Sequence, residues 1–251
     1  MVKLLLQAGV PIDVPDIFET PTHYYPLHYV AMREEVETTY ECLELLKSYG
    51  ARFDIRDPKY GRTPLHTASL FGNAIAVEWL IQEACHALPV GEALAFINQP
   101  EQGPFQRNTT LHNAVYGGHW AVVETLLNKG ADISACNYTG NTPLMELLCG
   151  PMSVDSKVHG LLLFYQREGS YHLTQNNLET LKQCTRPPFE EEILPALLKL
   201  KAEYPQLMHL ALNTSEEPPH GALLFSQSLA TTSPLTPKAT NIPVARYDGG
   251  F

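Results

Sequence analysis

The chain has 251 residues, of which 44% are hydrophobic and 18% are charged, and its formal net charge is −10. These proportions are typical of a globular protein and argue against a membrane protein or a wholly disordered one. The acidic balance disfavours nonspecific binding of nucleic acid, which requires basic surface to neutralise phosphates. It is compatible with a basic protein partner.

The five cysteines are widely spaced, and no two of them have C-x-x-C spacing. Structural zinc sites need ligands clustered at short spacing, so no metal site is predicted. The thiols are expected to be small buried side chains in a reducing compartment. No signal peptide or membrane span is predicted, because residues 1–7 hold too short an apolar run and no stretch approaches the length of a span. We therefore expect a cytoplasmic protein.

One sequence unit recurs along the chain. Its most regular copy runs from Asn108 to Asp132, and its start returns 33 residues later at Asn141, within Gly140-Asn-Thr-Pro-Leu. An earlier copy starts at Gly61 with Gly-Arg-Thr-Pro-Leu-His. A fixed period of this size is typical of stacked-repeat architectures.

The residues of the central copy explain why such a unit folds. The Thr109 hydroxyl is suited to cap a first helix, whose apolar side chains follow at helical spacing, and Gly117-Gly118 supplies the turn. A second helix carries one apolar stripe, and Gly130 ends it. Neither helix can bury its stripe alone, so the units must stack.

Thr-Pro-Leu-His, the Gly-His or Gly-Asn pair, the Leu-Leu run and Gly-Ala-Asp closely resemble the ankyrin repeat. This resemblance implies an all-α solenoid of helix-turn-helix units joined by hairpin loops. It also implies protein binding through variable residues on the concave face. It does not name the partner.

The stack is expected to occupy residues 1–170. Residues 2–9 read as the second helix of a partial first repeat, which indicates a truncated start, and about four copies follow. The first of these has Tyr25 in place of the capping threonine and is about four residues too long. We expect the surplus near residues 33–39, in the first helix or in the turn.

The largest departure from the period lies between Thr63 and Thr109, which are separated by 46 residues, 13 more than the period. The insertion is assigned to residues 85–106. Residues 91–97 are expected to extend a helix, and the prolines and glycine after them are expected to shape a loop. Insertions in repeat proteins often lie on the binding side. Because a longer loop costs little free energy, an insertion without a function is an equally good alternative.

In the last copy Met145 replaces the repeat's histidine. Residues 171–213 lose the period and are interpreted as an irregular helical cap, because terminal repeats need an atypical outer face. Residues 214–251 are rich in Ser, Thr and Pro and are expected to form a flexible tail.

The ten histidines do not indicate catalysis. His28, His66 and His112 occupy the same place in successive copies, which favours hydrogen bonding across the stack. The sequence contains no H-E-x-x-H, phosphate-binding loop or nucleophile elbow. We expect no enzymatic activity, cofactor or small-molecule substrate.

The resemblance places nine candidate partner-binding residues on the concave face. These residues are Lys59, Tyr60, Arg62, Leu70, Phe71, Asn108, Tyr116, Tyr138 and Asn141. Tyrosine and arginine are over-represented at binding hot spots. The alternative, that a side chain packs inside the stack, stays open for Leu70, Phe71 and the tyrosines at positions 60 and 138.

The leading hypothesis is a non-catalytic module that binds one protein through the concave face and the inserted loops. A second hypothesis is an adaptor or scaffold in which residues 171–251 recruit further machinery. A third is a bacterial effector secreted into the host cytoplasm. Neither nucleic acid nor a membrane is expected as a partner.

Overall fold

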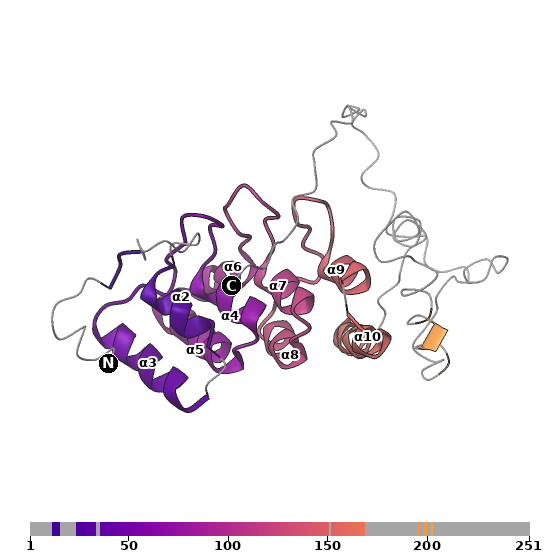
Figure 1. Cartoon of the computed structure of the whole chain (residues 1–251), viewed down its shortest axis with the longest axis horizontal. Helices are drawn as coiled ribbons and strands as arrows, with labels where there is room; N and C mark the ends of the chain where they lie inside the picture. Colours follow the sequence, from indigo (N-terminus) through magenta and orange to yellow (C-terminus); the bar gives the residue numbers. More distant parts are fainter. Residues whose placement is uncertain are drawn as a thin grey trace. The chain divides into compact units, whose positions relative to one another are not determined.

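The computed structural model describes residues 12–15, 24–33, 36–150 and 152–168, together with residues 195, 198, 199 and 202. Within them the regular elements are all helices (Figure 1). Four helices begin a repeat: α2 (Pro26–Ala31), α4 (Pro64–Phe71), α7 (Thr110–Tyr116) and α9 (Pro143–Cys149). Their companions are α3 (Val36–Ser48), α5 (Ala74–Ala87), α8 (Trp120–Asn128) and α10 (Val154–Glu168).

The helices form two layers. Each first helix packs on the next, from α2 through α4 and α7 to α9, and the second helices follow in the order α3, α5, α8 and α10 (Figure 1). The two helices of each repeat also pack on each other. The predicted all-α solenoid of helix-turn-helix units is thus confirmed for the described residues.

The core lies between the two layers, as the paired apolar stripes require. Leu65 and Leu111 of the first helices and Leu80 and Leu126 of the second helices are completely or almost completely buried. Burial of both stripes explains why the unit needs its neighbours.

The predicted caps are confirmed. The side chains of Thr63, Thr109 and Thr142 each accept a hydrogen bond from the backbone N–H three residues later. Tyr25, which stands in the same position before α2, makes no side-chain cap bond. The expected turn glycines Gly118 and Gly130 have φ values of 68° and 91°.

The four surplus residues in the copy at Tyr25 lie within the expected range 33–39, but their expected assignment to the first helix or the turn is wrong. Helix α2 has 6 residues against 7 in α7, whereas α3 has 13 against 9 in α8. The surplus therefore lies mainly in the second helix. The added turn packs inward, because Thr39 is buried near its start.

The expectation that residues 91–97 extend the preceding helix is wrong. They belong to a separate helix, α6 (Val90–Asn98), which packs on α5 and α7. Helix α5 stops at Ala87 because Leu88 precedes a proline and adopts an extended conformation, with φ −120° and ψ 150°. Phe96 and Ile97 anchor α6 in the core.

Several predictions fall outside the described residues. The partial repeat at residues 2–9 and the tail at residues 214–251 lie wholly outside them. The cap at residues 171–213 is described at only four positions.

Candidate functional site

Three loops precede α4, α7 and α9 and project on one side of the helices (Figure 1). We call residues 57–62 loop 1, residues 101–108 loop 2 and residues 137–141 loop 3. Each loop is closed by a backbone hydrogen bond of 2.9 Å between its ends, and in each the first residue's N–H donates to the last residue's carbonyl oxygen. Loop 2 contains the last of the inserted residues, 101–106, followed by Arg107 and Asn108 of the repeat itself.

Side chains within loops 1 and 3 hold their tips in place. The Asp57 carboxylate accepts the backbone N–H groups of Lys59 and Tyr60 at 3.0 and 2.7 Å, and that of Arg62 at 2.8 Å. In loop 3 the Asn137 side-chain oxygen accepts the N–H groups of residues 139 and 141 at 3.1 and 3.0 Å. These side-chain oxygens accept backbone N–H groups that have no backbone acceptor in a turn. They therefore hold each loop tip in one preferred conformation.

Backbone hydrogen bonds join the three loops to one another. The Gly103 N–H donates to the Tyr60 carbonyl at 2.8 Å, and the Gln102 N–H donates to the Gly61 carbonyl at 3.2 Å. On the other side the Tyr138 N–H donates to the Gln106 carbonyl at 2.7 Å. Loop 2 therefore bridges loops 1 and 3, and we refer to the three together as the joined loops.

A buried ion pair locks loop 2 to loop 1. Arg62 Nε lies 2.6 Å from Glu101 Oε1, and the two side chains are only 5% and 3% exposed. The Asn113 amide of α7 donates to the same carboxylate oxygen at 2.9 Å. The Arg62 guanidinium also lies 4.4 Å from the centre of the Tyr60 ring, within the range of a cation–π contact.

A chain of amides continues from loop 2 to loop 3. The buried Asn108 accepts a hydrogen bond from the Asn137 side chain at 3.0 Å. Asn137 and Asn141 both donate to the Glu146 carboxylate of α9, at 2.9 and 3.1 Å. Polar side chains thus connect the three loops beneath their tips.

The histidines cross-link the repeats, as predicted from their shared position. His66 Nε2–H donates to the Gln99 carbonyl at 3.0 Å, and its Nδ1 accepts the Thr63 N–H at 3.2 Å. Because a carbonyl oxygen can only accept, this geometry requires the neutral ring protonated at Nε2. Burial lowers the pKa of His66 to about 3, and nearby arginine charges act in the same direction.

His112 repeats this arrangement: its Nε2–H donates to the Asn141 carbonyl at 2.9 Å, and burial lowers its pKa. His28 differs. Its Nε2–H donates to the Arg62 carbonyl at 3.0 Å, but its buried Nδ1 has no hydrogen-bond partner in the described part of the chain. The missing partner follows from Tyr25, because in the other two copies a threonine hydroxyl at this position lies 2.8 Å from the histidine Nδ1.

Replacing Tyr25 with threonine is therefore expected to stabilise the first described repeat. The new hydroxyl would cap α2 and give His28 Nδ1 the partner that His66 has, which together contribute about 1 kcal/mol. Urea unfolding of the two chains measures the difference. Tyr25→Ala is the control, because it removes the ring without adding a hydroxyl. Equal stability of the threonine and alanine variants would refute this explanation.

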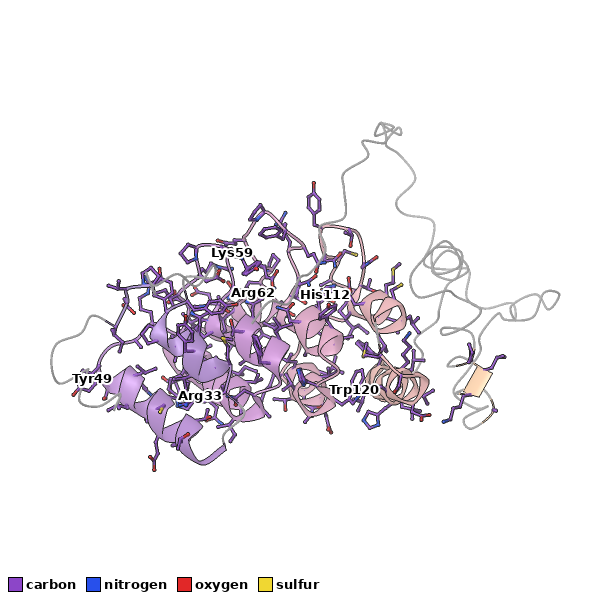
Figure 2. All side chains as sticks on the ribbon, viewed as in Figure 1. Arg33, Tyr49, Lys59, Arg62, His112 and Trp120 are labelled. Carbon is purple, nitrogen blue, oxygen red and sulfur yellow. The ribbon has the colours of Figure 1, made fainter. Side chains whose placement is uncertain are left out.

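The nine sequence-predicted residues fall into two groups. Six lie on the joined loops, with Lys59 uppermost among the labelled side chains and Arg62 beneath it in Figure 2. The other three, Leu70, Phe71 and Tyr116, lie at the far ends of α4 and α7. The eight residues of α4 separate the groups by about 12 Å at 1.5 Å per residue.

The exposure of these residues also differs. Tyr138 is 68% exposed. Six are half-buried: Lys59, Tyr60, Leu70, Phe71, Tyr116 and Asn141. The side chains of Arg62 and Asn108 are buried, at 4% and 5% exposure, and bond to neighbouring loops. Both therefore hold the joined loops together rather than facing solvent.

Sequence reasoning missed two residues of loop 2. Phe105 is 44% exposed, and its ring centre lies 5.4 Å from that of Tyr60. Arg107 is exposed and has a φ of 54°, at the place where loops 1 and 3 have Gly61 and Gly140. The sequence does show the equivalence of Arg107 with these glycines, because Arg107 stands two residues before its capping threonine, as Gly61 and Gly140 stand before theirs.

The described residues offer no group of three or more His, Cys, Asp or Glu side chains placed to hold a metal ion. Four described cysteines are free thiols, but two are half-buried and two are exposed, so the expectation of buried thiols is wrong for these four. None of the helices in this part of the chain is long and apolar enough to cross a membrane.

Comparison with known proteins gives consistent matches. A family model described as ankyrin repeats in three copies matches residues 1–90, and another, described as ankyrin repeats in many copies, matches residues 111–146. The chain is 37% identical over 86 residues to a putative ankyrin repeat protein of fowlpox virus, which covers 34% of this chain and 11% of that protein.

Two human proteins are also similar. SH3 and multiple ankyrin repeat domains protein 2 is 32% identical over 206 residues, or 81% of this chain and 9% of that protein. NF-kappa-B inhibitor delta is 30% identical over 115 residues, or 44% of this chain and 34% of that protein. The chain thus spans about a tenth of the length of the first two relatives and a third of the last.

Proposed function

Because this chain belongs to the ankyrin-repeat family, we propose that it is a non-catalytic module that binds a protein partner through the joined loops and the adjoining row of first helices. The observation that carries this proposal is the exposure of Phe105 and Tyr138 on loops whose backbones are bonded to each other. Rigid aromatic side chains supply contact area at low entropic cost, so they are favoured anchors.

The proposed surface keeps part of the sequence-predicted set and adds the two missed residues. It consists of Lys59, Tyr60, Tyr138 and Asn141 with Phe105 and Arg107. Leu70, Phe71 and Tyr116 form the far edge of the same row of helices and would contact a partner that extends across it. Arg62 and Asn108 are assigned a supporting role because they are buried.

The test compares two double variants of the intact chain. The partner is first identified among proteins that co-purify with the wild-type chain, and its affinity is then measured. Phe105→Ala with Tyr138→Ala is expected to weaken binding by more than about 2 kcal/mol, since both side chains reach solvent and the backbone bonds of the loops remain.

The matched control is Tyr40→Ala on α3 with Tyr49→Ala, the residue directly after this helix; the two side chains are 54% and 41% exposed. Tyr49 is labelled well away from Lys59 in Figure 2. The control is expected to bind like the wild type. Equal affinity of the two double variants would contradict the proposed surface.

The adaptor and secreted-effector hypotheses depend on residues 171–251, which are described at only four positions. They remain hypotheses, as does the cytoplasm as the compartment. The free thiols support a reducing compartment.

A further inference from the structure

The joined loops carry a positive charge in an acidic chain. Residues 57–62, 101–108 and 137–141 hold three basic and two acidic side chains, and Arg56 directly before loop 1 brings the formal charge to +2, whereas the whole chain has −10. The basic residues are Arg56, Lys59, Arg62 and Arg107, and the acidic ones are Asp57 and Glu101.

Both acidic side chains of this region point inward and are engaged there. Asp57 is 2% exposed and accepts three backbone N–H groups of its own loop. Glu101 is also 2% exposed and bonds to Arg62 and Asn113. The charges that reach solvent on the joined loops are therefore cationic, those of Lys59 and Arg107 among them.

The adjoining first helices do not offset this charge. Apart from their histidines, α2, α4 and α7 contain no ionisable side chain except Tyr29 and Tyr116, and the Glu146 carboxylate of α9 is bonded to Asn137 and Asn141. Burial lowers the pKa of His28, His66 and His112, so these rings are neutral at pH 7.

The second-helix layer has the opposite sign. Helices α3, α5, α8 and α10 together hold eight acidic and three basic side chains, a formal charge of −5. The two layers in Figure 1 thus separate charge across the stack. Such a field attracts an anionic partner to the joined loops and repels it from the opposite layer.

One of these cations, Arg107, has a backbone conformation that is unfavourable for a non-glycine residue. Its φ of 54° lies in the left-handed region, where loops 1 and 3 use glycine at the same position. This conformation is unfavourable for any residue with a Cβ. Backbone strain of this kind is concentrated at functional sites, where the surrounding structure fixes the position of the strained residue.

We propose that the joined loops bind an acidic peptide segment of the partner, one that carries an apolar side chain among its carboxylates. Lys59 and Arg107 meet the carboxylates, while Phe105 and Tyr138 receive the apolar side chain. Nucleic acid is the less favoured anion, because its binding requires many phosphate contacts and the chain as a whole is strongly acidic. This inference rests on the proposed function and adds the chemistry of the partner.

The experiment is a selection from a library of random 12-residue peptides displayed against the intact chain. The enriched peptides are expected to be net acidic and to contain an aromatic or large aliphatic residue. Their affinity, measured by fluorescence anisotropy, is expected to fall at least tenfold between 50 and 300 mM salt. It should fall at least tenfold again in a Lys59→Gln, Arg107→Gln variant.

The control is Lys47→Gln with Lys129→Gln, which removes the same charge from exposed ion pairs of the second-helix layer. It is expected to bind the acidic peptides like the wild type. Enriched peptides that are neutral or basic, or a failure to enrich any peptide, would overturn the inference. So would a single-stranded DNA 12-mer that binds more tightly than the selected peptides.

The two proposals fail in different ways. If the selected peptides are neutral and do not bind the Phe105→Ala, Tyr138→Ala variant, the inference of an acidic partner is wrong and the proposed surface stands. If the selected peptides are acidic and bind this variant and the wild type equally, the proposed binding surface is wrong.

Discussion

Replacing Glu101 with alanine is expected to lower the free energy of unfolding by about 3–5 kcal/mol. The change leaves the buried Arg62 guanidinium without the carboxylate that lies 2.6 Å from its Nε. Removing one partner of a buried ion pair costs this much because the remaining charge cannot be rehydrated. Urea unfolding followed by circular dichroism measures the loss.

Two further variants separate this cause from a general loss of packing. Replacing both partners, with Arg62→Met and Glu101→Leu, is expected to cost less than Glu101→Ala alone, because no charge stays buried. Arg52→Ala breaks an exposed pair with Asp54 and should change stability little. A loss below about 1 kcal/mol in Glu101→Ala would show that the pair does not hold loop 2 on loop 1.

Replacing Gly103 with alanine is expected to separate loops 1 and 2. A Cβ at this position would lie 2.4 Å from the Tyr60 carbonyl oxygen and 2.5 Å from its carbonyl carbon, which are backbone atoms that cannot rotate away. Overpacking of this kind costs about 1–3 kcal/mol. The hydrogen bond from the Gly103 N–H to Tyr60 should also be lost, and with it part of the affinity for the partner.

Two glycines serve as controls for this substitution. Gly140 of loop 3 has open space around its Cβ position but a φ of 80°, so alanine there adds backbone strain alone. Gly91 of α6 has open space and lies in a helix, so alanine should stabilise the chain by about 0.5–1 kcal/mol. If Gly103→Ala has the same free energy of unfolding and the same affinity for the partner as Gly91→Ala, the close approach of loops 1 and 2 is contradicted.

The repeat itself was predictable from the sequence because its signals are local. A threonine cap, a proline at the first helical position and a turn glycine act within a few residues of one another. The place of α6 was also encoded locally, in Pro89, which disfavours helix at Leu88. This proline is the local signal that separates residues 91–97 from α5.

The joining of the loops could not be predicted in the same way. Arg62 and Glu101 are 39 residues apart, and the insertion at residues 85–106 obscures the register of Glu101, so no local pattern in the sequence brings the two side chains together. Periodicity places Arg62 in a hairpin loop, where an exposed side chain is expected, whereas its side chain is buried in an ion pair with Glu101 of loop 2. For the same reason Phe105 had no signal as a neighbour of Tyr60.

Hydrogen exchange of the intact chain with and without its identified partner tests the central claim most directly. If the joined loops are the binding surface, the partner should slow exchange in residues 57–62, 101–108 and 137–141 together, since their backbones are bonded to one another. Exchange in α3, α5 and α8 should not change. Protection confined to those second helices, or to one loop without the other two, would contradict the account.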